Sequence, residues 1–448
     1  MEIGILGGGI AGLSVALTLR RQGYNPRVYE RRTAPATMGA GVTLWPNASF
    51  VLQELGLLQD IKAIGGRPLT MRRQDAVGNA LGGLDIALLD RMMGYPTYTV
   101  LRRHLQEVLL DHAARAGIPV EFGHRAVAIE LDANGRAMAH FDNGASTRPD
   151  LLIGADGRMD SVARKFVAGD NTPVYQGFVN WIGVAQAQHA LVDDIAIQDF
   201  WGAGERFGCV AIRPELVYWA AAQARPLSEA RPAADMRKEV DDLFAGWPEP
   251  VVHIIRATPA NAIRLIAVHD LEPLHTWSRA NVLLVGDAAH APLPTSGQGA
   301  CQALEDAWHL ARCLDATSGG LDDVFQAFAR IRAPKTARLT EQGRVFARGL
   351  FGTDPEACRI RNERAKASNP MHDVQVLAAG WAQGLPMPVC TDGAPAQGEG
   401  FGSLSHRMLL AGLPASDQFA CGCDRTLAMR QWAQLSLHSC HLHQLREW

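Results

Sequence analysis

The 448-residue sequence lacks two features that would place it in a class at once: a long apolar run and an excess of charge of one sign. No run approaches the roughly 18 apolar residues that a membrane-spanning helix needs, which excludes an integral membrane protein. Lys and Arg number 43 against 46 Asp and Glu, for a formal net charge of -3. Because no basic excess is available to neutralise phosphates, nucleic acid is not an expected partner.

Cysteine is scarce as well, and eight residues do not make a disulfide framework in a chain of this length. The sequence is 47% hydrophobic and 20% charged, which is typical of a globular protein that buries a core without disulfides or metals. A basic segment followed by an apolar leader is missing too, because residues 3–6 run directly into three glycines. We therefore expect a cytoplasmic protein of two or three domains.

The first 30 residues show the pattern of a strand, a glycine loop, a helix and a second strand. In the loop, Gly7 permits a tight turn, Gly9 lets a pyrophosphate approach the backbone, and Gly12 lets the helix and strand pack closely. Glu30 ends the second strand 18 residues after Gly12, where a carboxylate can bond a ribose hydroxyl. This pattern predicts a dinucleotide site but does not distinguish FAD from NAD.

The rest of the chain mixes helical and strand patterns up to about residue 350. Helices are expected over 100–116 and 301–314, and buried strands over 151–153 and 282–285. Further strands are expected over 120–122 and 127–131, with Asn-Gly hairpin turns at 134–135 and 143–144. Alternating and aromatic segments dominate residues 171–274, which predicts a β-rich region.

Two later segments carry more specific patterns, DLLIGADGRMDSVAR over residues 150–164 and VGDAAHAPLPTSGQGACQALEDA over residues 285–307. Together with the N-terminal loop they resemble the three fingerprints of the FAD-dependent aromatic hydroxylases, the group A flavoprotein monooxygenases with a para-hydroxybenzoate hydroxylase-like fold. The resemblance covers about residues 1–388. It implies an α/β protein in which a Rossmann-like FAD-binding domain is interleaved with a β-rich substrate domain and followed by C-terminal helices.

The family pattern also implies domain boundaries. We expect a discontinuous FAD-binding domain over residues 1–75, 100–170 and 275–350. The substrate-binding domain should comprise residues 76–99 and 171–274, and a C-terminal helix should cover 351–388. Residues 389–448 are expected to be a linker and an extension of unknown role. The extension contains Cys421, Cys423, His438, Cys440, His441 and His443, whose spacing fits no zinc module, so no metal is expected.

The resemblance assigns residues to non-covalent FAD. Asp287 ends a buried strand, where its carboxylate could bond the ribityl chain. The N–H groups of 297–299 would stabilise negative charge on the N1–C2=O edge of reduced flavin. Arg102 matches the family arginine that reaches the cofactor, although the neighbouring Arg103 is an alternative, and His290 is expected to belong to the loop scaffold. The expected cofactor-binding residues are Gly7, Gly9, Ala11, Gly12, Glu30, Arg31, Thr43, Arg102, Ala126, Asp156, Asp287, Gly297, Gln298, Gly299, Ala300 and Cys301.

On the substrate side, residues 177–183 and Arg206 with Tyr218 resemble the FAD-dependent urate hydroxylases more than the salicylate hydroxylases. The arginine fork would bind an anionic oxygen of the substrate, and the tyrosine hydroxyl would orient the ring and hold the arginine. The alternative is a structural Arg–Tyr pair in a sheet. Trp181, Trp201 and Trp219 could line an aromatic pocket, but core packing is the default expectation for each.

The implied reaction is hydroxylation of a small aromatic or N-heteroaromatic substrate, urate-like or hydroxybenzoate-like, with NAD(P)H and O2, through a flavin hydroperoxide. A second glycine-rich loop for nicotinamide is missing, so NADH and NADPH are both possible transient co-substrates. Three alternatives stay open: epoxidation or decarboxylative hydroxylation of a larger natural product, a flavin-free binding or regulatory protein, and a nicotinamide dehydrogenase. Substrate, regiochemistry and oligomeric state do not follow from the sequence.

Overall fold

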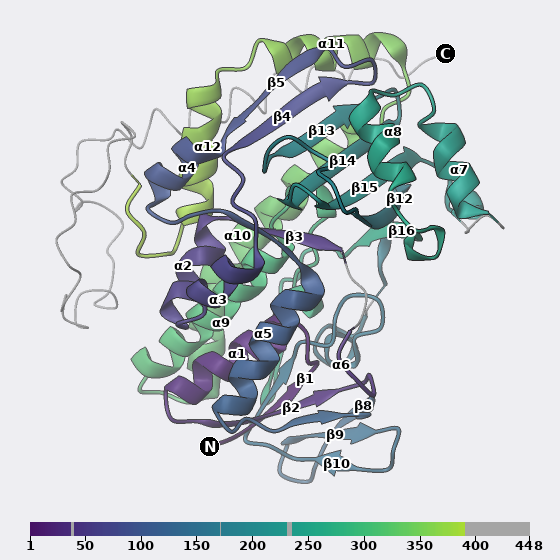
Figure 1. Cartoon of the computed structure of the whole chain (residues 1–448). Coiled ribbons are helices and arrows are strands. Elements are labelled where there is room, and N and C mark those ends of the chain that lie inside the picture. The colour runs from purple at the N-terminus through teal and green to yellow at the C-terminus, as the bar shows by residue number, and fades with distance from the viewer. Residues whose placement is uncertain (37–39, 171, 231–234, 390–448) are drawn as a thin grey trace, which may run out of the picture. The chain divides into compact units, whose positions relative to one another are not determined.

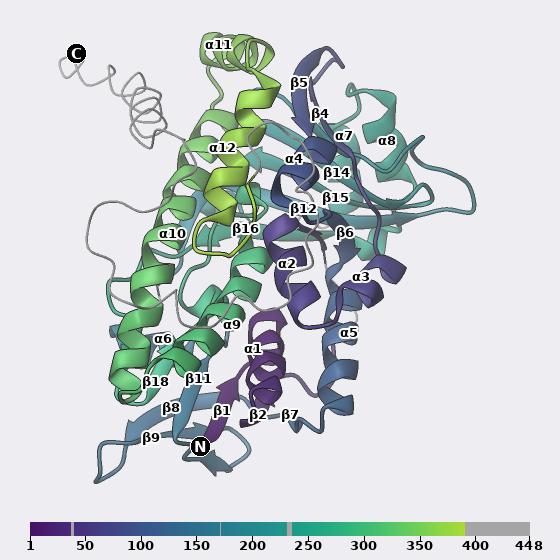
Figure 2. The ribbon, with the colours of Figure 1, turned by 90° about the vertical axis from the view of Figure 1, so that its left-hand side faces the viewer.

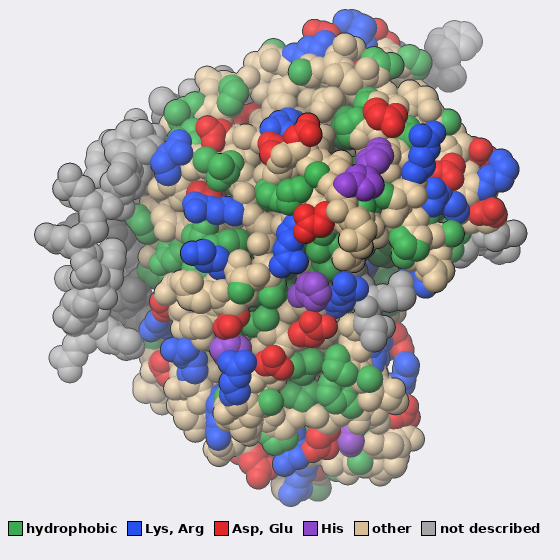
Figure 3. All heavy atoms as spheres, in the orientation of Figure 1, with side chains coloured by type: hydrophobic (Ala, Val, Ile, Leu, Met, Phe, Trp, Pro, Cys, Tyr) green, Lys and Arg blue, Asp and Glu red, His purple; other side chains and the backbone are tan. Residues whose placement is uncertain are grey.

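The structure is a computed structural model that describes residues 1–36, 40–170, 172–230 and 235–389. The expectations for the extension, including its Cys and His residues, fall on 390–448 and lie outside the described residues. Among the described helices, none is both long and apolar enough to cross a membrane. On the face drawn in Figure 3, basic and acidic side chains are interspersed, in keeping with the nearly balanced charge.

A six-stranded sheet in the order β17-β18-β11-β1-β2-β7 forms the first part of the fold. Its strands are parallel except at the β17 edge. The strands are β1 (Glu2–Leu6), β2 (Asn25–Glu30), β7 (Val120–Phe122), β11 (Leu151–Gly154), β17 (Ser278–Arg279) and β18 (Val282–Leu284). The central strands are short apolar runs because a parallel sheet with helices over it buries both faces.

Helices and a small antiparallel sheet accompany this parallel sheet. The antiparallel sheet is the meander β8 (Ala126–Leu131), β9 (Ala137–Phe141) and β10 (Ser146–Thr147), whose two tight turns confirm the hairpins expected at the Asn-Gly pairs. The helices are α1 (Ile10–Arg21), α5 (Arg102–Arg115), α6 (Val162–Ala168) and α9 (Gly299–Ala316). The helix expected over 100–116 begins at Arg102, because Val100 and Leu101 end a strand.

The second sheet has seven strands in the order β16-β12-β15-β14-β13-β4-β5, antiparallel except for the β13–β4 pair. The strands are β4 (Thr70–Asp75), β5 (Ala80–Asp85), β12 (Val174–Gln186), β13 (Ile197–Trp201), β14 (Glu205–Arg213), β15 (Leu216–Ala224) and β16 (Arg264–Asp270). This sheet corrects the expected boundary at residue 75, because the hairpin of β4 and β5 lies wholly within it.

The two faces of the seven-stranded sheet differ because side chains alternate along each strand. One face carries Trp181, Phe200, Phe207 and Trp219 and buries them in a core of its own. The helices α7 (Met236–Leu243) and α8 (Glu249–Arg256) contribute Val240 and Ile254 among others to that core, and Figure 1 shows both helices beside this sheet. The other face carries Arg206, Gly208 and Tyr218 and is left for the site described below.

The remaining elements connect the two sheets. They are β3 (Gly41–Leu44), β6 (Tyr98–Leu101), α2 (Pro46–Glu54), α3 (Leu58–Ile64), α4 (Ile86–Met93), α10 (Leu321–Leu350), α11 (Pro355–Lys366) and α12 (Pro370–Ala382). Figures 1 and 2 show α10 running from the level of the six-stranded sheet to that of the seven-stranded sheet. The expected single helix over 351–388 is in fact the pair α11 and α12, separated by a turn before Pro370.

Candidate active site

Two cavities lie along the carboxyl ends of the parallel strands and continue toward the seven-stranded sheet. The smaller has a volume of about 130 Å³ and the larger about 580 Å³. Gly9, Arg102, Ala155 and Gly157 line both. An elongated ligand with a polar centre could therefore pass from one cavity into the other beside Gly9 and Arg102.

The glycine loop is built as its sequence predicts. Gly7 has a positive φ of 111°, which a residue with a side chain rarely adopts. A Cβ at Gly12 would lie 1.9 Å from the carbonyl oxygen of Gly7, so α1 can approach the loop only because this position is glycine. A Cβ at Gly9 would meet nothing within 4 Å, and Gly9 faces both cavities just before α1. Gly12 thus shapes the loop without lining a cavity, while Gly9 exposes backbone to it.

The smaller cavity is lined by several of the expected cofactor-binding residues, which besides Gly9 and Arg102 are Gly7, Glu30, Arg31, Ala126 and Asp156. Glu30 is buried, and its two carboxylate oxygens accept the N–H groups of Gly8 at 2.7 Å and Arg32 at 2.9 Å. These bonds fix its carboxylate at the cavity wall.

Asp156 lines the same cavity, but its carboxylate serves the turn that follows β11. Its oxygens accept hydrogen bonds from the Ser161 hydroxyl at 2.5 Å and the Ala163 N–H at 3.1 Å. Burial raises the pKa of this carboxyl group above its ordinary value. Because Asp156 lines this cavity, it stays an expected cofactor-binding residue.

Arg102 and Arg103 were both candidates for the arginine that reaches the cofactor, and their surroundings differ. Arg102 is the first residue of α5 and lines both cavities, whereas the Nε of Arg103 donates to the neighbouring His104 ring. Burial lowers the pKa of Arg102, and the charge of Asp287 opposes that shift. Asp287 lines the larger cavity and forms an ion pair with Arg158 at 3.3 Å. Arg102 is thus the arginine placed to meet a ligand.

The segment that enters α9 forms another wall of the larger cavity. Gly297, with a positive φ of 62°, lines that cavity together with Gly299 and Ala300. The Gln298 and Cys301 side chains do not line it. Gln298 is buried and accepts a hydrogen bond from Asn47 at 2.9 Å. The Cys301 thiol points to the carbonyl of Thr43 at 3.6 Å, and burial raises its pKa to about 12, so this thiol is protonated and inert.

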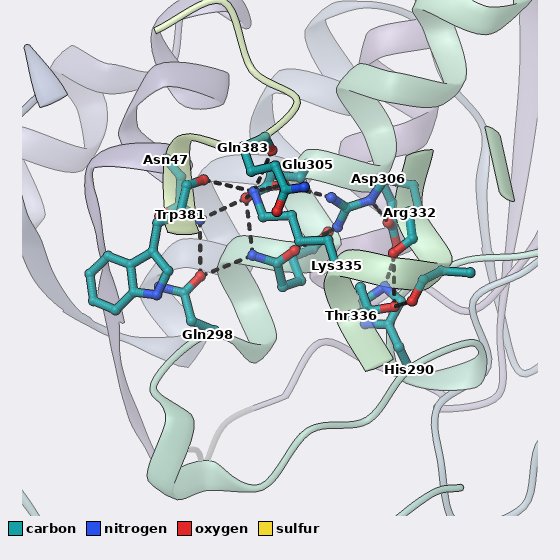
Figure 4. A network of polar contacts seen from close by, with 12 residues as sticks. Asn47, His290, Gln298, Glu305, Asp306, Arg332, Lys335, Thr336, Trp381 and Gln383 are labelled. Carbon is teal, nitrogen blue, oxygen red and sulfur yellow. Dashed lines mark hydrogen bonds and ion pairs between the residues drawn. The ribbon is translucent and has the colours of Figure 1, made fainter. Parts of the chain in front are cut away.

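Behind this segment lies a network of buried charged side chains (Figure 4). Lys335 Nζ donates to Glu305 at 2.8 Å and to the carbonyl oxygens of Trp381 at 2.7 Å and Gln383 at 2.9 Å. Arg332 bonds Glu305 at 2.6 Å and Asp306 at 2.7 Å. Burial lowers the pKa of Lys335 to about 8. Burial alone would raise the pKa of Glu305. The positive charges of Lys335 and Arg332 outweigh this effect, so the pKa of Glu305 is lowered. The network therefore ties α9 and α10 to the end of α12.

His290 belongs to the same network. Its Nε2 lies 2.6 Å from Asp306, which also accepts the N–H of Gly286 at 2.7 Å. Burial would raise the pKa of Asp306, but the charges of His290 and Arg332 outweigh it and lower the pKa. Since His290 is buried and does not line the larger cavity, the scaffold role expected from the sequence agrees with its position.

The seven-stranded sheet supplies the opposite wall of the larger cavity, including Arg206 and Tyr218. The Nε of Arg206 donates to Asp199 at 2.6 Å, and a Cβ at Gly208 would lie 3.3 Å from Nη2 of Arg206. The guanidinium is thus held by Asp199 and lies over Gly208. Tyr218 does not hold the arginine, contrary to the sequence expectation. A Cβ at Gly41 would lie 2.7 Å from the Tyr218 ring, which therefore packs on this glycine.

Several lining residues were not found from the sequence. Trp45 and Trp381 line the larger cavity with rings 4.9 Å apart, whereas Trp181, Trp201 and Trp219 do not line it and are buried, as the default interpretation held. Other lining residues that were missed include Arg73, Arg158, Asn180 and Gln198. Period-2 alternation could have placed Asp199 and Trp201 on one face of β13, and the glycines of the three-residue loop 202–204 could have signalled the hairpin that brings Asp199 to Arg206.

Both cavities fit FAD on the evidence of the residues present. The glycine cradle accepts backbone approach at Gly9, where an added Cβ would meet open space, as it also would at Gly299. Arg102 lies where a pyrophosphate would be neutralised, and Asp287 is an acceptor at the larger cavity. Thr43 and Ala11 line that cavity as well.

Replacement of Asp287 by Ala is expected to weaken FAD binding by roughly 10-fold or more, because a charged hydrogen-bond acceptor at the cavity is lost. The measurement is the FAD content of the purified variant and its Kd for FAD by fluorescence titration. Asp287→Asn should retain part of the affinity, and Asp111→Ala, an exposed change on α5, should leave it unchanged. A normal flavin content in Asp287→Ala would remove this residue from the cofactor site.

Comparisons with known proteins agree with this geometry. The family profile described as "FAD binding domain" matches residues 1–342. The FAD-dependent urate hydroxylase of Klebsiella pneumoniae is 34% identical over 344 residues, covering 76% of this chain and 87% of that protein. The Aurachin C monooxygenase/isomerase of Stigmatella aurantiaca is 32% identical over 337 residues, covering 75% and 85% respectively. The crystal structure of Klebsiella pneumoniae HpxO complexed with FAD and uric acid matches with a TM-score of 0.78 and 29% identity, covering 86% of this chain and 97% of that chain.

Proposed function

The chain belongs to the FAD-dependent aromatic hydroxylases, and on that premise we propose that it uses NAD(P)H and O2 to hydroxylate a small aromatic or N-heteroaromatic compound that binds as an anion. The protein is a flavin-dependent monooxygenase with FAD as its cofactor. The finer proposal concerns the electron donor and the substrate. It rests on the way Arg206 is presented to the larger cavity.

The observation that carries the proposal is the anchoring of Arg206. Asp199 holds only its Nε, at 2.6 Å, while the guanidinium lies over Gly208 in the larger cavity. An arginine oriented in this way presents a planar fork to an oxygen of a ring substrate. It favours the ionised form of a phenol, enol or acidic N–H, and the ionised ring is the more electron-rich one.

Bound FAD would accept electrons from the nicotinamide and activate O2, which is chemistry that no side chain supplies. The chain's own residues bind, orient and exclude water. Arg102, Asp287 and the backbone of Gly299 and Ala300 would hold the cofactor. Arg206 would fix the substrate anion on the opposite wall, and α12 covers the cavity with Leu377 and Trp381. No described acid or histidine in the larger cavity other than Asp287 offers a general base.

Tyr218 is a donor to the substrate in this proposal. Burial raises the pKa of its phenol to about 12, although nearby Arg206 opposes the shift. Its hydroxyl therefore remains protonated at neutral pH and can donate to a carbonyl or anionic oxygen.

Replacement of Tyr218 by Phe is expected to lower kcat/KM by roughly 3- to 10-fold, the cost of one hydrogen bond. The shape of the kcat/KM profile should not change below about pH 11, because the tyrosine does not ionise there. Measured pH profiles of both proteins check this. The wild-type profile could instead show a fall in kcat/KM below that pH which is missing in the variant. This result would contradict the assignment of Tyr218 as a permanently protonated donor.

A second candidate is oxidation of a larger heteroaromatic natural product. It is supported by the similarity to the Aurachin C monooxygenase/isomerase and by the apolar residues that extend the same wall, among them Ile182, Ile197 and Ile266. In this case Arg206 would bind one polar end of a molecule whose remainder lies on the apolar surface.

One experiment separates the two candidates: NAD(P)H oxidation by the FAD-loaded protein in air, with urate, salicylate, hydroxybenzoates and hydroxyquinolines. Strong stimulation by a small anionic ring, with a hydroxylated product, supports the first. Stimulation only by the hydroxyquinolines supports the second. Rates that no compound changes, in a protein that retains FAD, would contradict the proposed substrate class.

A further inference from the structure

Arg73 is a second arginine on the cavity face of the seven-stranded sheet. It lies in β4 and lines the larger cavity. The pairing register places it in one row with Asp199 of β13 and Gly208 of β14. Residues paired across strands point to the same face of a sheet, so Arg73 and the guanidinium over Gly208 flank Asp199.

Both carboxylate oxygens of Asp199 already accept a hydrogen bond from a neighbouring side chain. One oxygen accepts from Arg206 Nε at 2.6 Å, and the other accepts from Trp201 Nε1 at 2.9 Å. The guanidinium of Arg73 lies 5.7 Å from the centre of the Trp201 ring. Its Nε is buried without a hydrogen-bond partner among the described residues.

The charges on this wall do not balance. Among the described residues, the charged side chains that the seven-stranded sheet contributes to the cavity lining are Arg73 and Arg206. Asp199, next to them, can neutralise one of these two positive charges. A cation with a buried N–H donor and no counter-ion costs free energy of folding. A ligand in the cavity can remove that cost if it supplies an anionic hydrogen-bond acceptor.

We propose that Arg73 binds a second acidic group of the substrate, so that the substrate carries a carboxylate or equivalent anion in addition to the oxygen held by Arg206. This inference rests on the proposed function, because it places an anionic aromatic substrate in the same cavity. With β13 alone between β4 and β14, the two backbones lie about 10 Å apart, and both arginines line the larger cavity. Arg73 is thus a specificity-determining residue that selects a ring acid over its neutral analogue.

The test uses pairs of similar shape in which a neutral amide replaces the carboxylate: salicylate and salicylamide, 3-hydroxybenzoate and 3-hydroxybenzamide, and 4-hydroxybenzoate and 4-hydroxybenzamide. Each Kd is measured on the FAD-loaded protein from the change in flavin absorbance, so no turnover is needed. The wild-type protein is expected to prefer the acid in at least one pair by roughly 10-fold or more, as a charge-assisted contact predicts. Arg73→Met should abolish that preference, and Arg73→Lys should retain part of it.

Arg72→Met is the matched control, because Arg72 lies next to Arg73 on β4 and pairs with the exposed Asp194. It should keep the wild-type preference. The FAD content of every variant reports on folding, and Arg73→Gln replaces Arg73→Met if the latter does not retain FAD. An unchanged acid preference after loss of Arg73, or a wild-type protein that prefers no acid to its amide, would overturn the inference. A protein that discriminates as expected but hydroxylates nothing would overturn the proposed function alone.

Discussion

Replacement of Arg206 by Met is expected to lower kcat/KM for the stimulating substrate by about 100-fold, while FAD remains bound. The side chain is held by Asp199 on the sheet wall of the larger cavity, and it does not contribute to the loop and helix segments that line the cofactor side. Its loss removes a positive, doubly hydrogen-bonding group from the substrate and leaves the glycine loop and the α9 segment intact. Stopped-flow measurement of flavin reduction by NAD(P)H, with and without substrate, is the most direct assay.

Two further variants separate this effect from loss of structure. Arg206→Met removes the ion-pair partner of the buried Asp199, so the double variant Arg206→Met/Asp199→Asn also removes the carboxylate that has lost this partner. It should regain stability without regaining activity. Arg213→Met changes an exposed arginine on the same strand and should behave as wild type. Substrate stimulation that survives in Arg206→Met would assign Arg206 to the structure of the sheet.

Replacement of Lys335 by Met is expected to lower the free energy of unfolding by about 3 kcal/mol or more, because Glu305 loses a cation in a fully buried site. The same change cuts the bonds from Lys335 to the carbonyl oxygens of Trp381 and Gln383. Since Leu377 and Trp381 of α12 line the larger cavity, FAD retention should fall together with stability. Urea unfolding followed by flavin fluorescence measures both.

The control for this variant is Lys366→Met on α11. Lys366 pairs with Glu363 at 3.4 Å in an exposed position, where an ion pair contributes about 0 to 1 kcal/mol. Equal losses of stability in the two variants would mean that the buried network does not hold α12 in place.

The sequence predicts the local parts of this protein well. The glycine loop, Glu30 and the strand before Asp287 follow from patterns within about 30 residues of chain, because the turn, the helix start and the strand end are local structures. The expectation for Arg102 comes from the family resemblance, with Arg103 as the alternative, and the structure distinguishes the two because Arg102 lines both cavities.

The parts that the sequence does not predict depend on pairing between distant strands. Arg73 joins the wall of Asp199 and Arg206 only through the register of β4 with β13, whereas Asp199 and Arg206 already lie on the two strands of one hairpin. The parallel pairing of β13 with β4 connects segments more than 100 residues apart, and no local pattern specifies it. Likewise, Gln298 and Cys301 lie in the right motif, but helix geometry turns their side chains away from the cavity.

We expect the FAD-loaded protein to insert one oxygen atom from O2 into an anionic aromatic substrate. The most direct measurement is a reaction under ¹⁸O2 with NAD(P)H and the compound that best stimulates its oxidation, with the product analysed by mass spectrometry. We predict one ¹⁸O atom in each product molecule and one NAD(P)H consumed for each product formed. A product whose new oxygen comes from water, or NAD(P)H oxidation that yields only hydrogen peroxide with every compound, would contradict the account.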